Sequence, residues 1–516
     1  MRVKSYQVSF LLLLFAFSVQ VEAATFYIDP TCSVAGDGST SVCTGAGGTS
    51  PLTGITSPAS NNTYLFKAGT TLNKTTPISI NGVTNVTLST YGGTERAKVT
   101  VDSTNHFALY IHNSTNISVS NLAFTAVKET VTYESAIYID ESTTTDTISL
   151  TNVSGSGSTG NGLSILVGVS NVTVTGGVYS DNTFSAAGSI SLGGTNSSGI
   201  LIAGASNVNV IGATIKNNGY TAQAFDPGQG QYINEGRGIT IQDSGGTPST
   251  NITITDNIIV NNGDRIGEEG SGIEGANSQS VTIARNFIYG STGFEVKRSS
   301  NNWTINSNII VGKSSNVFQY GYFTSDSTGS SIYNNTIVGI RPAGKAYQVL
   351  MGLTSASACS LCQNNIIVYA GEMSAANAVG IQLGRATWTS TELATFDTVL
   401  NYNNVYGVSS SKYVETITGA SVFTDYTLAA WKIVFPNQAA NDTTVDPKFL
   451  KSIDPTISSY YKIASSSQLK SAGKFLNRGN IGDNSNKAFL IPPPIGALNP
   501  EETLNRTTAT IRTNRN

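Results

Sequence analysis

Residues 250–263 read TNITITDNIIVNNG, and this stretch contains the two patterns that decide the fold. In NITI at 251–254, apolar residues alternate with an asparagine and a small polar residue, as in a strand with one buried face. NIIV at 257–260 opens with a second asparagine only six residues later. Two short strands this close together, each opening with asparagine, predict a tight bend between them.

Both patterns recur along the chain. The first returns as NVTL 85–88, NISV 116–119, NVTV 171–174, NVNV 207–210 and NWTI 302–305, with DTISL 146–150 and SVTI 280–283 in the same register. The second returns as NFIY 286–289, NIIV 308–311, NTIV 335–338, NIIV 365–368 and NVY 404–406, in steps of 29, 22, 27, 30 and 39 residues. A minimum step near 22 with variable additions indicates coils of one solenoid that carry insertions at particular turns.

A third short strand, usually opening with glycine, completes each coil. Examples are GLSILVG 162–168, GITIQDS 238–244 and GFEVKRS 293–299. Three strands per coil predict an all-β fold, a right-handed parallel β-helix whose alternating Ile, Val and Leu side chains stack in the core. Asparagines at the bends can bond to their own backbone and to the asparagine of the next coil. A β-sandwich would need regularly spaced hairpin turns, which the pattern lacks.

The coils resemble the pectate-lyase-like superfamily of right-handed β-helix proteins, and the two ends resemble secreted β-helix repeat proteins. The opening resemblance rests on TFYIDP 25–30, GDGSTS 36–41 and FKAGTTL 66–72. The closing resemblance rests on YTLAAW 426–431, DPKF 446–449, YYKIASSSQLKSAG 460–473 and IGAL 495–498. The superfamily includes lyases, hydrolases, epimerases and non-catalytic surface proteins, so the resemblance implies a fold and not one activity.

We expect five segments along the chain. They are a signal peptide at 1–23, an N-terminal strand and cap at 24–80, the β-helix at 81–410, a C-terminal cap at 411–498 and a tail at 499–516. The first has a basic start, an apolar middle and a small-residue cleavage site, which predicts a secreted protein, extracellular or periplasmic. No later stretch is apolar enough to span a membrane.

The composition limits the kinds of molecule that the protein is expected to bind. Charged residues make up only 12% of the chain, glycine supplies 52 residues, and no basic stripe suits nucleic acid. We expect a monomer that binds a polysaccharide. Cys32 and Cys43 bracket a loop near the mature start and are expected to form a disulfide. Cys359 and Cys362 form a lone CxxC, for which a local disulfide or reduced thiols is favoured over a metal site.

The third strands predict which side chains face outward. Aligned by their alternation, they give one column that reads Tyr110, Tyr138, Ser164, Leu201, Thr240, Glu274, Glu295, Gln319 and Gln382. A second column reads His112, Asp140, Leu166, Ala203, Gln242, Ala276, Lys297, Gly321 and Gly384. Charge therefore gathers on one exposed sheet face, where strands lie about 4.8 Å apart. We interpret Tyr110 over Tyr138 as a packing stack and His112 beside Asp140 as a structural pair.

Insertions in the same coils are expected to wall a groove beside this face. The insertion at 217–237 carries three aromatic residues, Tyr220, Phe225 and Tyr232, among glycine and polar residues. Such rings suit sugars, whose CH faces stack while their hydroxyls form hydrogen bonds. We add Gln242, Arg265 and Gln319 as substrate-binding candidates.

Three functions fit these residues. The leading prediction is a polysaccharide lyase, in which Lys297 is the base, Arg237 or Arg265 pairs with a uronate carboxylate, and Glu274 with Glu295 holds a calcium ion as the possible cofactor. A lysine beside two carboxylates is a poor base unless calcium offsets their charges. The Glu-x-Lys string also departs from chondroitinase-B-like lyases, because no Arg-His follows it.

The second reading is a retaining glycoside hydrolase that uses Glu274 and Glu295, whose expected separation near 5 Å suits that mechanism. The clustered aspartates and nearby histidine typical of polygalacturonases are absent from this stretch. The third reading is a non-catalytic glycan-binding or surface protein, in which the charges form only a surface ladder.

Overall fold

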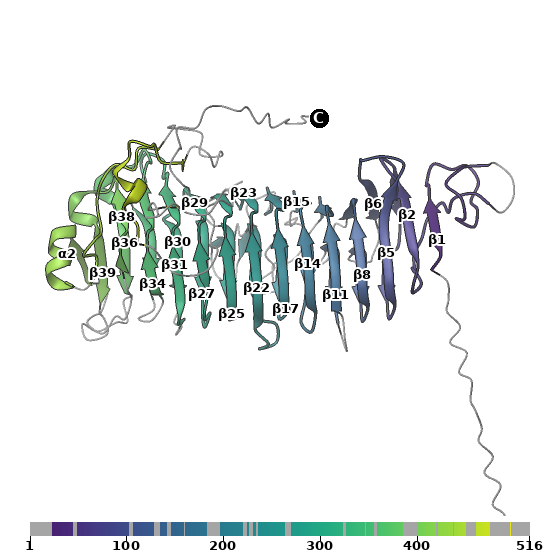
Figure 1. Ribbon diagram of the computed structural model, residues 1–516, viewed down its shortest axis with the longest axis horizontal. Coiled ribbons are helices and arrows are strands. Elements are labelled where there is room, and N and C mark those ends of the chain that lie inside the picture. Colours follow the sequence, from purple (N-terminus) through teal and green to yellow (C-terminus); the bar gives the residue numbers. More distant parts are fainter. Residues whose placement is uncertain are drawn as a thin grey trace, which may run out of the picture.

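A computed structural model gives the three-dimensional structure of the chain, in which residues 25–28 and residues 428–434 lie at opposite ends of one long axis (Figure 1). It describes residues 23–44, 49–102, 107–127, 135–141, 146–158, 160–182, 197–219, 224–226, 231–233, 236–263, 270–290, 292–322, 327–345, 347–354, 359–384, 400–418, 422–436, 438–449, 461–474 and 496. Residues 1–22 of the expected signal peptide and the expected tail lie outside the described residues.

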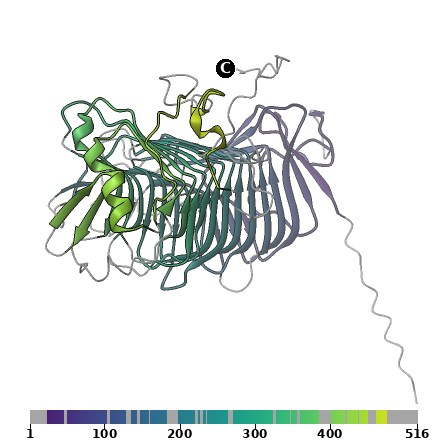
Figure 2. The ribbon, with the colours of Figure 1, turned by 60° about the vertical axis from the view of Figure 1, so that its left-hand side comes forward.

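Three long sheets run along this axis, and the chain passes from one sheet to the next as it winds (Figure 2). Sheet 1 has 13 strands. In spatial order they are β1 (Thr25–Ile28), β2 (Thr63–Lys67), β5 (Thr84–Tyr91), β8 (Thr115–Ser120), β11 (Asp146–Thr151), β14 (Ser170–Thr175), β17 (Ser206–Ile211), β22 (Ser249–Thr255), β25 (Ser278–Ala284), β28 (Thr304–Asn306), β31 (Ser330–Tyr333), β34 (Cys359–Gln363) and β37 (Leu400–Asn401).

Sheet 2 contains the second asparagine pattern and has 12 strands. They are β3 (Thr71–Lys74), β6 (Ala97–Asp102), β9 (Leu122–Val127), β12 (Ser154–Ser156), β15 (Val178–Ser180), β18 (Thr214–Lys216), β23 (Ile258–Asn262), β26 (Phe287–Gly290), β29 (Ile309–Gly312), β32 (Thr336–Gly339), β35 (Ile366–Tyr369) and β38 (Asn404–Tyr406).

Sheet 3 carries the strands that open with glycine and has 13 strands. They are β4 (Ile78–Asn81), β7 (Phe107–His112), β10 (Ser135–Asp140), β13 (Asn161–Ile165), β16 (Ser197–Ala203), β21 (Gly236–Gln242), β24 (Gly270–Ala276), β27 (Thr292–Lys297), β30 (Asn316–Tyr322), β33 (Gln348–Leu353), β36 (Ala378–Gly384), β39 (Val414–Thr418) and β40 (Val422–Tyr426). Among the described residues, every pair of neighbouring strands within the three sheets is parallel except β39–β40. The predicted parallel β-helix is confirmed.

A row of buried asparagines crosses the coils at the bend between sheets 1 and 2. Asn286 Nδ2 lies 3.0 Å from Asn308 Oδ1, and Asn308 Nδ2 lies 3.0 Å from Asn335 Oδ1. Each side-chain oxygen also accepts a hydrogen bond from a backbone N–H of the preceding coil. The buried amide groups of the bend are therefore hydrogen-bonded. The row runs through Asn257, Asn286, Asn308, Asn335, Asn365 and Asn403.

The last member of this row corrects the sequence alignment by one residue. Asn404 stands in register with Ile366 and lies in strand β38, so the asparagine of the row is Asn403. The row ends on Asp442, whose Oδ1 accepts the Asn403 backbone N–H at 2.7 Å and whose other oxygen accepts the Tyr413 hydroxyl.

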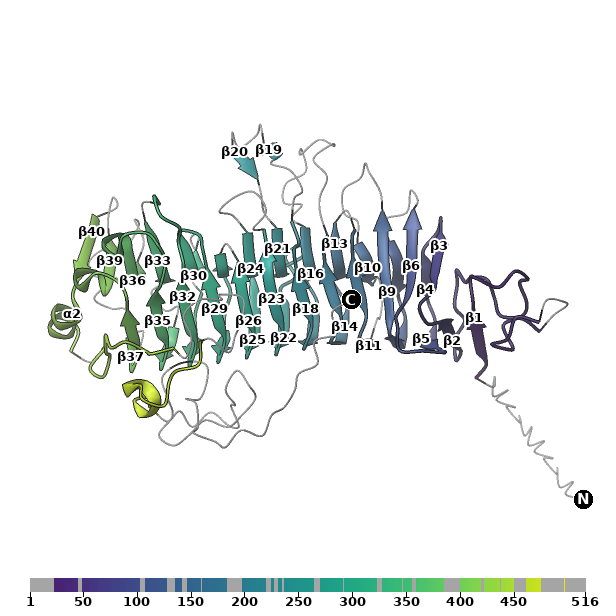
Figure 3. The ribbon, with the colours of Figure 1, turned by 90° about the horizontal axis from the view of Figure 1, so that it is seen from above.

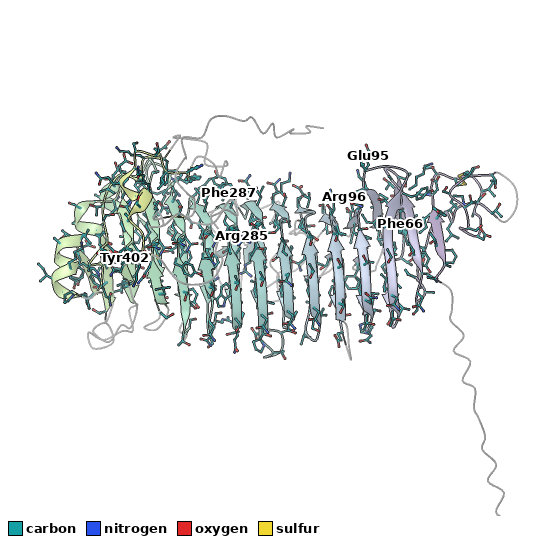
Figure 4. All side chains as sticks on the ribbon, viewed as in Figure 1. Phe66, Glu95, Arg96, Arg285, Phe287 and Tyr402 are labelled. Carbon is teal, nitrogen blue, oxygen red and sulfur yellow. A yellow bond between two sulfur atoms is a disulfide. The ribbon has the colours of Figure 1, made fainter. Side chains whose placement is uncertain are left out.

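The residue before each asparagine of the row has a left-handed backbone, which is rare outside glycine. The φ angles are 61° at Asp256, 58° at Arg285 and 58° at Tyr402, and Figure 4 labels the last two. Arg285 also pairs with Asp256 one coil away, with Nη2 2.7 Å from Oδ2. The stacked bends hold this conformation, because each is bonded to the bends above and below it.

Caps close both ends of the coil stack. At the N-terminus β1 joins sheet 1, and the predicted Cys32–Cys43 disulfide is present beside it. Cys359 and Cys362 form a second disulfide. At the other end, helix α2 (Leu428–Val434) buries Trp431 against Tyr426 and Phe435.

The remaining short elements are η1 (Ala375–Asn377), η2 (Ser410–Lys412) and η4 (Gln468–Ser471), with the hairpin β19 (Ala224–Asp226) and β20 (Gln231–Ile233). Among the described residues, every helix is too short or too polar to cross a membrane.

Candidate active site

The outward column of sheet 3 is the base of the site. Register pairs link Thr240 to Glu274, Glu274 to Glu295, and Glu295 to Gln319, as the sequence predicts. After Gln319 the column continues through Gly352 to Gln382, so the predicted direct step from Gln319 to Gln382 is wrong. The missed strand, β33, reads QVLMGL and opens without a glycine.

A second correction concerns Lys297. A register shift between Val296 and Lys297 pairs Lys297 with Tyr322, whereas the sequence alignment placed Gly321 there. On its other side Lys297 pairs with Ala276 as predicted. Because Lys297 still follows Glu295 by two residues, both side chains lie on the same face of the sheet.

Arg237 completes the cluster from strand β21. Its backbone is in register with Ser198 and Ser271, and its side chain reaches Glu274 on the next strand, where Nε lies 2.6 Å from Oε2. Arg237 was predicted to pair with a substrate carboxylate, but it pairs with a carboxylate of the protein.

The two glutamates share one ammonium group. Lys297 Nζ lies 3.0 Å from Glu295 Oε2 and 3.5 Å from Glu274 Oε2. Ser271 Oγ donates to Glu295 Oε2 at 3.4 Å. We call Arg237, Glu274, Glu295 and Lys297 the charged cluster; its two cations and two anions balance formally.

The charged cluster is mostly shielded from water. The exposed fractions of its side chains are 8% for Glu274, 9% for Arg237, 13% for Glu295 and 19% for Lys297. Exposed ion pairs contribute little to stability, but removing one partner of a buried pair leaves an uncompensated charge. The cluster is therefore more than a solvated surface ladder.

Burial and neighbouring charges shift the pKa values of two members of the charged cluster, Glu295 and Lys297. Burial raises the pKa of the Glu295 carboxyl, and the Glu274 charge raises it further, against the opposing effect of Lys297 and Arg237. Burial lowers the pKa of Lys297, but the charges of Glu295 and Glu274 raise it by more, so its net pKa lies above the usual range. Lys297 is thus a strongly held cation.

The predicted calcium ion does not fit this arrangement. Calcium takes six to eight oxygen ligands, whereas Glu274 and Glu295 provide two carboxylates that already bind Lys297 and Arg237. Within the described ranges, no group of three or more His, Cys, Asp or Glu side chains could hold a metal ion.

The predicted substrate-binding residues are only partly placed near the charged cluster. Gln319 is in register with Glu295 and is buried, while Gln242 ends strand β21 in register with Ala203. Phe225 and Tyr232 pair across the β19–β20 hairpin, which stands out beside β16 and β21 in Figure 3. Tyr220 and Arg265 lie outside the described residues.

A second polar group farther along the same column was not predicted. Gln382 Nε2 lies 2.6 Å from Glu415 Oε1, which also accepts the hydroxyl of Tyr347, and Lys412 Nζ lies 3.6 Å from Glu415 Oε2. The sequence signal was the polar residue inside VETIT at 414–418, but this strand lacks the opening glycine.

Part of the coiled region matches a known family model. Residues 107–310 match the family model described as "Right handed beta helix region". The protein is a right-handed parallel β-helix. No curated protein sequence matches this β-helix.

Solved structures similar to the β-helix include pectate lyase Pel9A, with a TM-score of 0.43 and 12% identity over 93% of this chain and 97% of that one. The GH136 lacto-N-biosidase from Eubacterium ramulus has a TM-score of 0.37 and 10% identity over 82% and 67% of the two chains. The A-module of mannuronan C-5 epimerase AlgE6 from Azotobacter vinelandii has a TM-score of 0.36 and 15% identity over 75% and 91%.

Proposed function

We propose that the β-helix cleaves a polysaccharide at the charged cluster, and that the reaction is glycoside hydrolysis with retention of configuration. The observation that carries this proposal is the pair of carboxylates, Glu274 and Glu295, that share Lys297 Nζ at 3.5 and 3.0 Å. Their Oε2 atoms are therefore separated by no more than the sum of these distances. Retaining enzymes keep the two carboxyl groups about 5 Å apart, whereas inverting enzymes need about 6.5–9.5 Å.

The surroundings of the two carboxyls assign their roles. Glu295, whose pKa burial raises, is the general acid that protonates the oxygen of the leaving sugar. Glu274, which is bonded to Arg237 and Lys297, attacks the anomeric carbon as the carboxylate while the glycosidic C–O bond breaks. Glu295, now ionised, takes a proton from water, and the resulting hydroxide displaces Glu274.

The two cations position these groups. Lys297 and Arg237 hold Glu274 from two sides, and Lys297 also holds Glu295. Gln319, and the hairpin that carries Phe225 and Tyr232, are proposed to contact the sugars on either side of the cleaved bond. Two disulfides are consistent with an oxidising compartment, so we propose that the substrate is an extracellular glycan.

Elimination by Lys297 is the second candidate, because Arg237 and Lys297 bring two cations to one face of the sheet. A lyase needs this lysine deprotonated, and its raised pKa opposes that. A uronate would also have to approach two carboxylates. Hydrolysis is therefore the reaction that the geometry supports better.

The test is incubation of the purified protein with a panel of neutral and acidic polysaccharides, followed for reducing ends and for the ultraviolet absorbance of unsaturated uronates. Hydrolysis produces reducing ends without absorbance, and Glu295→Gln should slow their release about 10³-fold. The matched control is Asp256→Asn, which removes an ion-paired carboxylate on the bend between sheets 1 and 2. Absorbance that rises with the reducing ends would transfer the assignment to elimination, and a panel without any product would refute cleavage.

A further inference from the structure

An aromatic cluster lies on the same face of sheet 3, nearer the N-terminus. It consists of Phe107, Tyr110 and His112 on β7 and Tyr138 on β10. The ring centroids of Phe107 and Tyr138 are 4.1 Å apart, and those of Phe107 and Tyr110 are 5.4 Å apart, with near-parallel planes. Tyr110 also stacks on His112 at 5.5 Å. The four rings form one layered surface.

These rings are partly exposed and do not form the core of the coils that contain β7 and β10. The inward side chains of the same two strands, Leu109, Ile111, Ile137 and Ile139, are fully buried and pack inside the coil. Tyr110, His112 and Tyr138 alternate with them and project to the outer face. Phe107 opens β7, and its ring stacks on Tyr110 and Tyr138. Large rings gathered on an outer face present apolar area to a binding partner.

Polar groups border the rings. His112 Nδ1 lies 2.7 Å from Asp140 Oδ1, and Asn113 Nδ2 lies 2.8 Å from His112 Nε2. The Tyr110 hydroxyl is bonded to Asp140, and burial raises the pKa of both Tyr110 and Tyr138 to about 12, so both hydroxyls stay protonated donors. Flat apolar rings with hydrogen-bonding groups at their edge match a sugar ring, which has an apolar CH face and a rim of hydroxyls.

We propose that Phe107, Tyr110, His112 and Tyr138 form a glycan-binding surface, distinct from the charged cluster, that stacks against a neutral sugar ring whose hydroxyls bond to Asp140. A neutral sugar is favoured because a uronate carboxylate would face the Asp140 carboxylate, while the nearby His112 is already bonded to it. This surface binds glycan without cleaving it.

The position of the aromatic cluster suits a long chain. Tyr138 and Glu274 belong to one outward column, separated by β13, β16 and β21. Four steps of about 4.8 Å place them about 19 Å apart. A polysaccharide that lies along the sheet face can therefore contact both clusters, whereas a short oligosaccharide reaches only one.

The test is affinity electrophoresis of the purified protein in gels that contain a neutral β-glucan, a mannan or polygalacturonate. We expect retardation by a neutral polysaccharide, and Tyr138→Ala should weaken it about tenfold. Tyr138→Phe keeps the ring and should bind as the unmodified protein does. Asp256→Asn changes the bend between sheets 1 and 2, away from both clusters, and should leave retardation unchanged.

Two further variants serve as controls for the proposed role of Tyr138 in glycan binding. Tyr406→Ala removes a tyrosine of sheet 2 that is 37% exposed, and it should not alter retardation. Tyr138→Leu keeps apolar packing without a flat ring, and it replaces the alanine variant if that protein fails to fold. Equal retardation of Tyr138→Leu and the unmodified protein, retardation by polygalacturonate alone, or no retardation in either neutral gel would overturn the proposal.

Discussion

The charged cluster and the aromatic cluster occupy matching positions on one sheet face. Register links Leu109 to Ile239 through successive strands, so Phe107 and Arg237, each two residues earlier, occupy the same place in their coils. Tyr138 and Glu274 share the outward column, and His112 follows Tyr110 as Lys297 follows Glu295. The coil geometry is common to both regions, and only the side chains differ.

The charged side chains need oppositely charged neighbours, whereas the aromatic side chains need only other rings to pack against. The four charges are 8–19% exposed, and they coexist because each anion lies against a cation. The aromatic rings stack on one another and remain partly exposed to solvent. A change in the charged cluster should therefore disturb both chemistry and stability, while a change in the aromatic cluster should mainly disturb binding.

The largest expected effect is on turnover. Glu295→Gln removes the proposed proton donor and should lower kcat about 10³-fold, because general acid catalysis typically contributes about 10²–10⁴-fold. Tyr138→Ala should leave kcat on a short soluble oligosaccharide unchanged. Initial rates for both variants, with thermal midpoints to verify folding, check this contrast. Equal losses of kcat in the two variants would remove the distinction between the regions.

The next effect is on stability. Lys297→Met leaves Glu274 and Glu295 without their shared cation and should lower the free energy of unfolding by about 3 kcal/mol. Tyr138→Phe should change it by less than about 0.5 kcal/mol. Urea unfolding of the two variants measures both values.

A double variant sharpens the interpretation of that loss. If unpaired carboxylates cause it, Lys297→Met should be less damaging in a Glu274→Gln background, because one of the two anions is already gone. An unchanged loss in that background would attribute the effect to packing of the lysine stem.

A smaller effect concerns pH, and the two regions should respond in different windows. Glu295 has a raised pKa in the folded protein, so its contribution to stability is complete below its ordinary value of 4.5 and is lost as pH rises through the raised value. Tyr110 and Tyr138 contribute fully below pH 10, and this contribution is lost as pH rises through about 12. Thermal midpoints measured across pH for the unmodified protein, Glu295→Gln and Tyr138→Phe check both windows.

Asp442 is the control for the lower pH window, because burial raises its pKa to about 6 and its effect has the same sign. The difference between the curves of the unmodified protein and Glu295→Gln isolates the contribution of Glu295. The difference in thermal midpoint between the two proteins could stay constant between pH 4 and 8 while Asp442→Asn abolishes the pH dependence of the midpoint. In that case the pH dependence of stability comes from Asp442, at the end of the asparagine row, and not from Glu295.

The smallest effect is expected at the ion pair on the bend between sheets 1 and 2. Asp256→Asn should lower the free energy of unfolding by only about 0.5 kcal/mol, since the Asp256 side chain is 32% exposed and water screens the pair. The same urea series measures it. A loss as large as that of Lys297→Met would show that burial does not distinguish the charged cluster from ordinary pairs.

The sequence predicts the coils and most of the outward column because both depend on local alternation. Asn251 lies inside β22, near its start, and Asn257 directly precedes β23. The column from Tyr110 to Gln319 follows from counting every second residue. The prediction fails where a strand lacks its opening glycine, as in β33, and where a bulge shifts the register at Lys297.

Side-chain reach could not be predicted from alternation. The Arg237 side chain crosses to Glu274 although its backbone is in register with Ser271. Gly275 occupies an inward position where neighbouring coils have Ile241 and Val296, because the Trp303 ring fills the space: a Cβ on this glycine would lie 2.3 Å from Trp303 Cη2. Such contacts depend on residues of different coils, and a pattern within one strand does not report them.

The most direct test of the account is the anomeric configuration of the first product, followed by proton NMR as the protein digests its best polysaccharide substrate. We expect a saturated new reducing end that first appears with the configuration of the cleaved bond, because we propose a double displacement by Glu274 and Glu295, which share Lys297. A product that first appears with inverted configuration, or an unsaturated uronate at the new end, would contradict it.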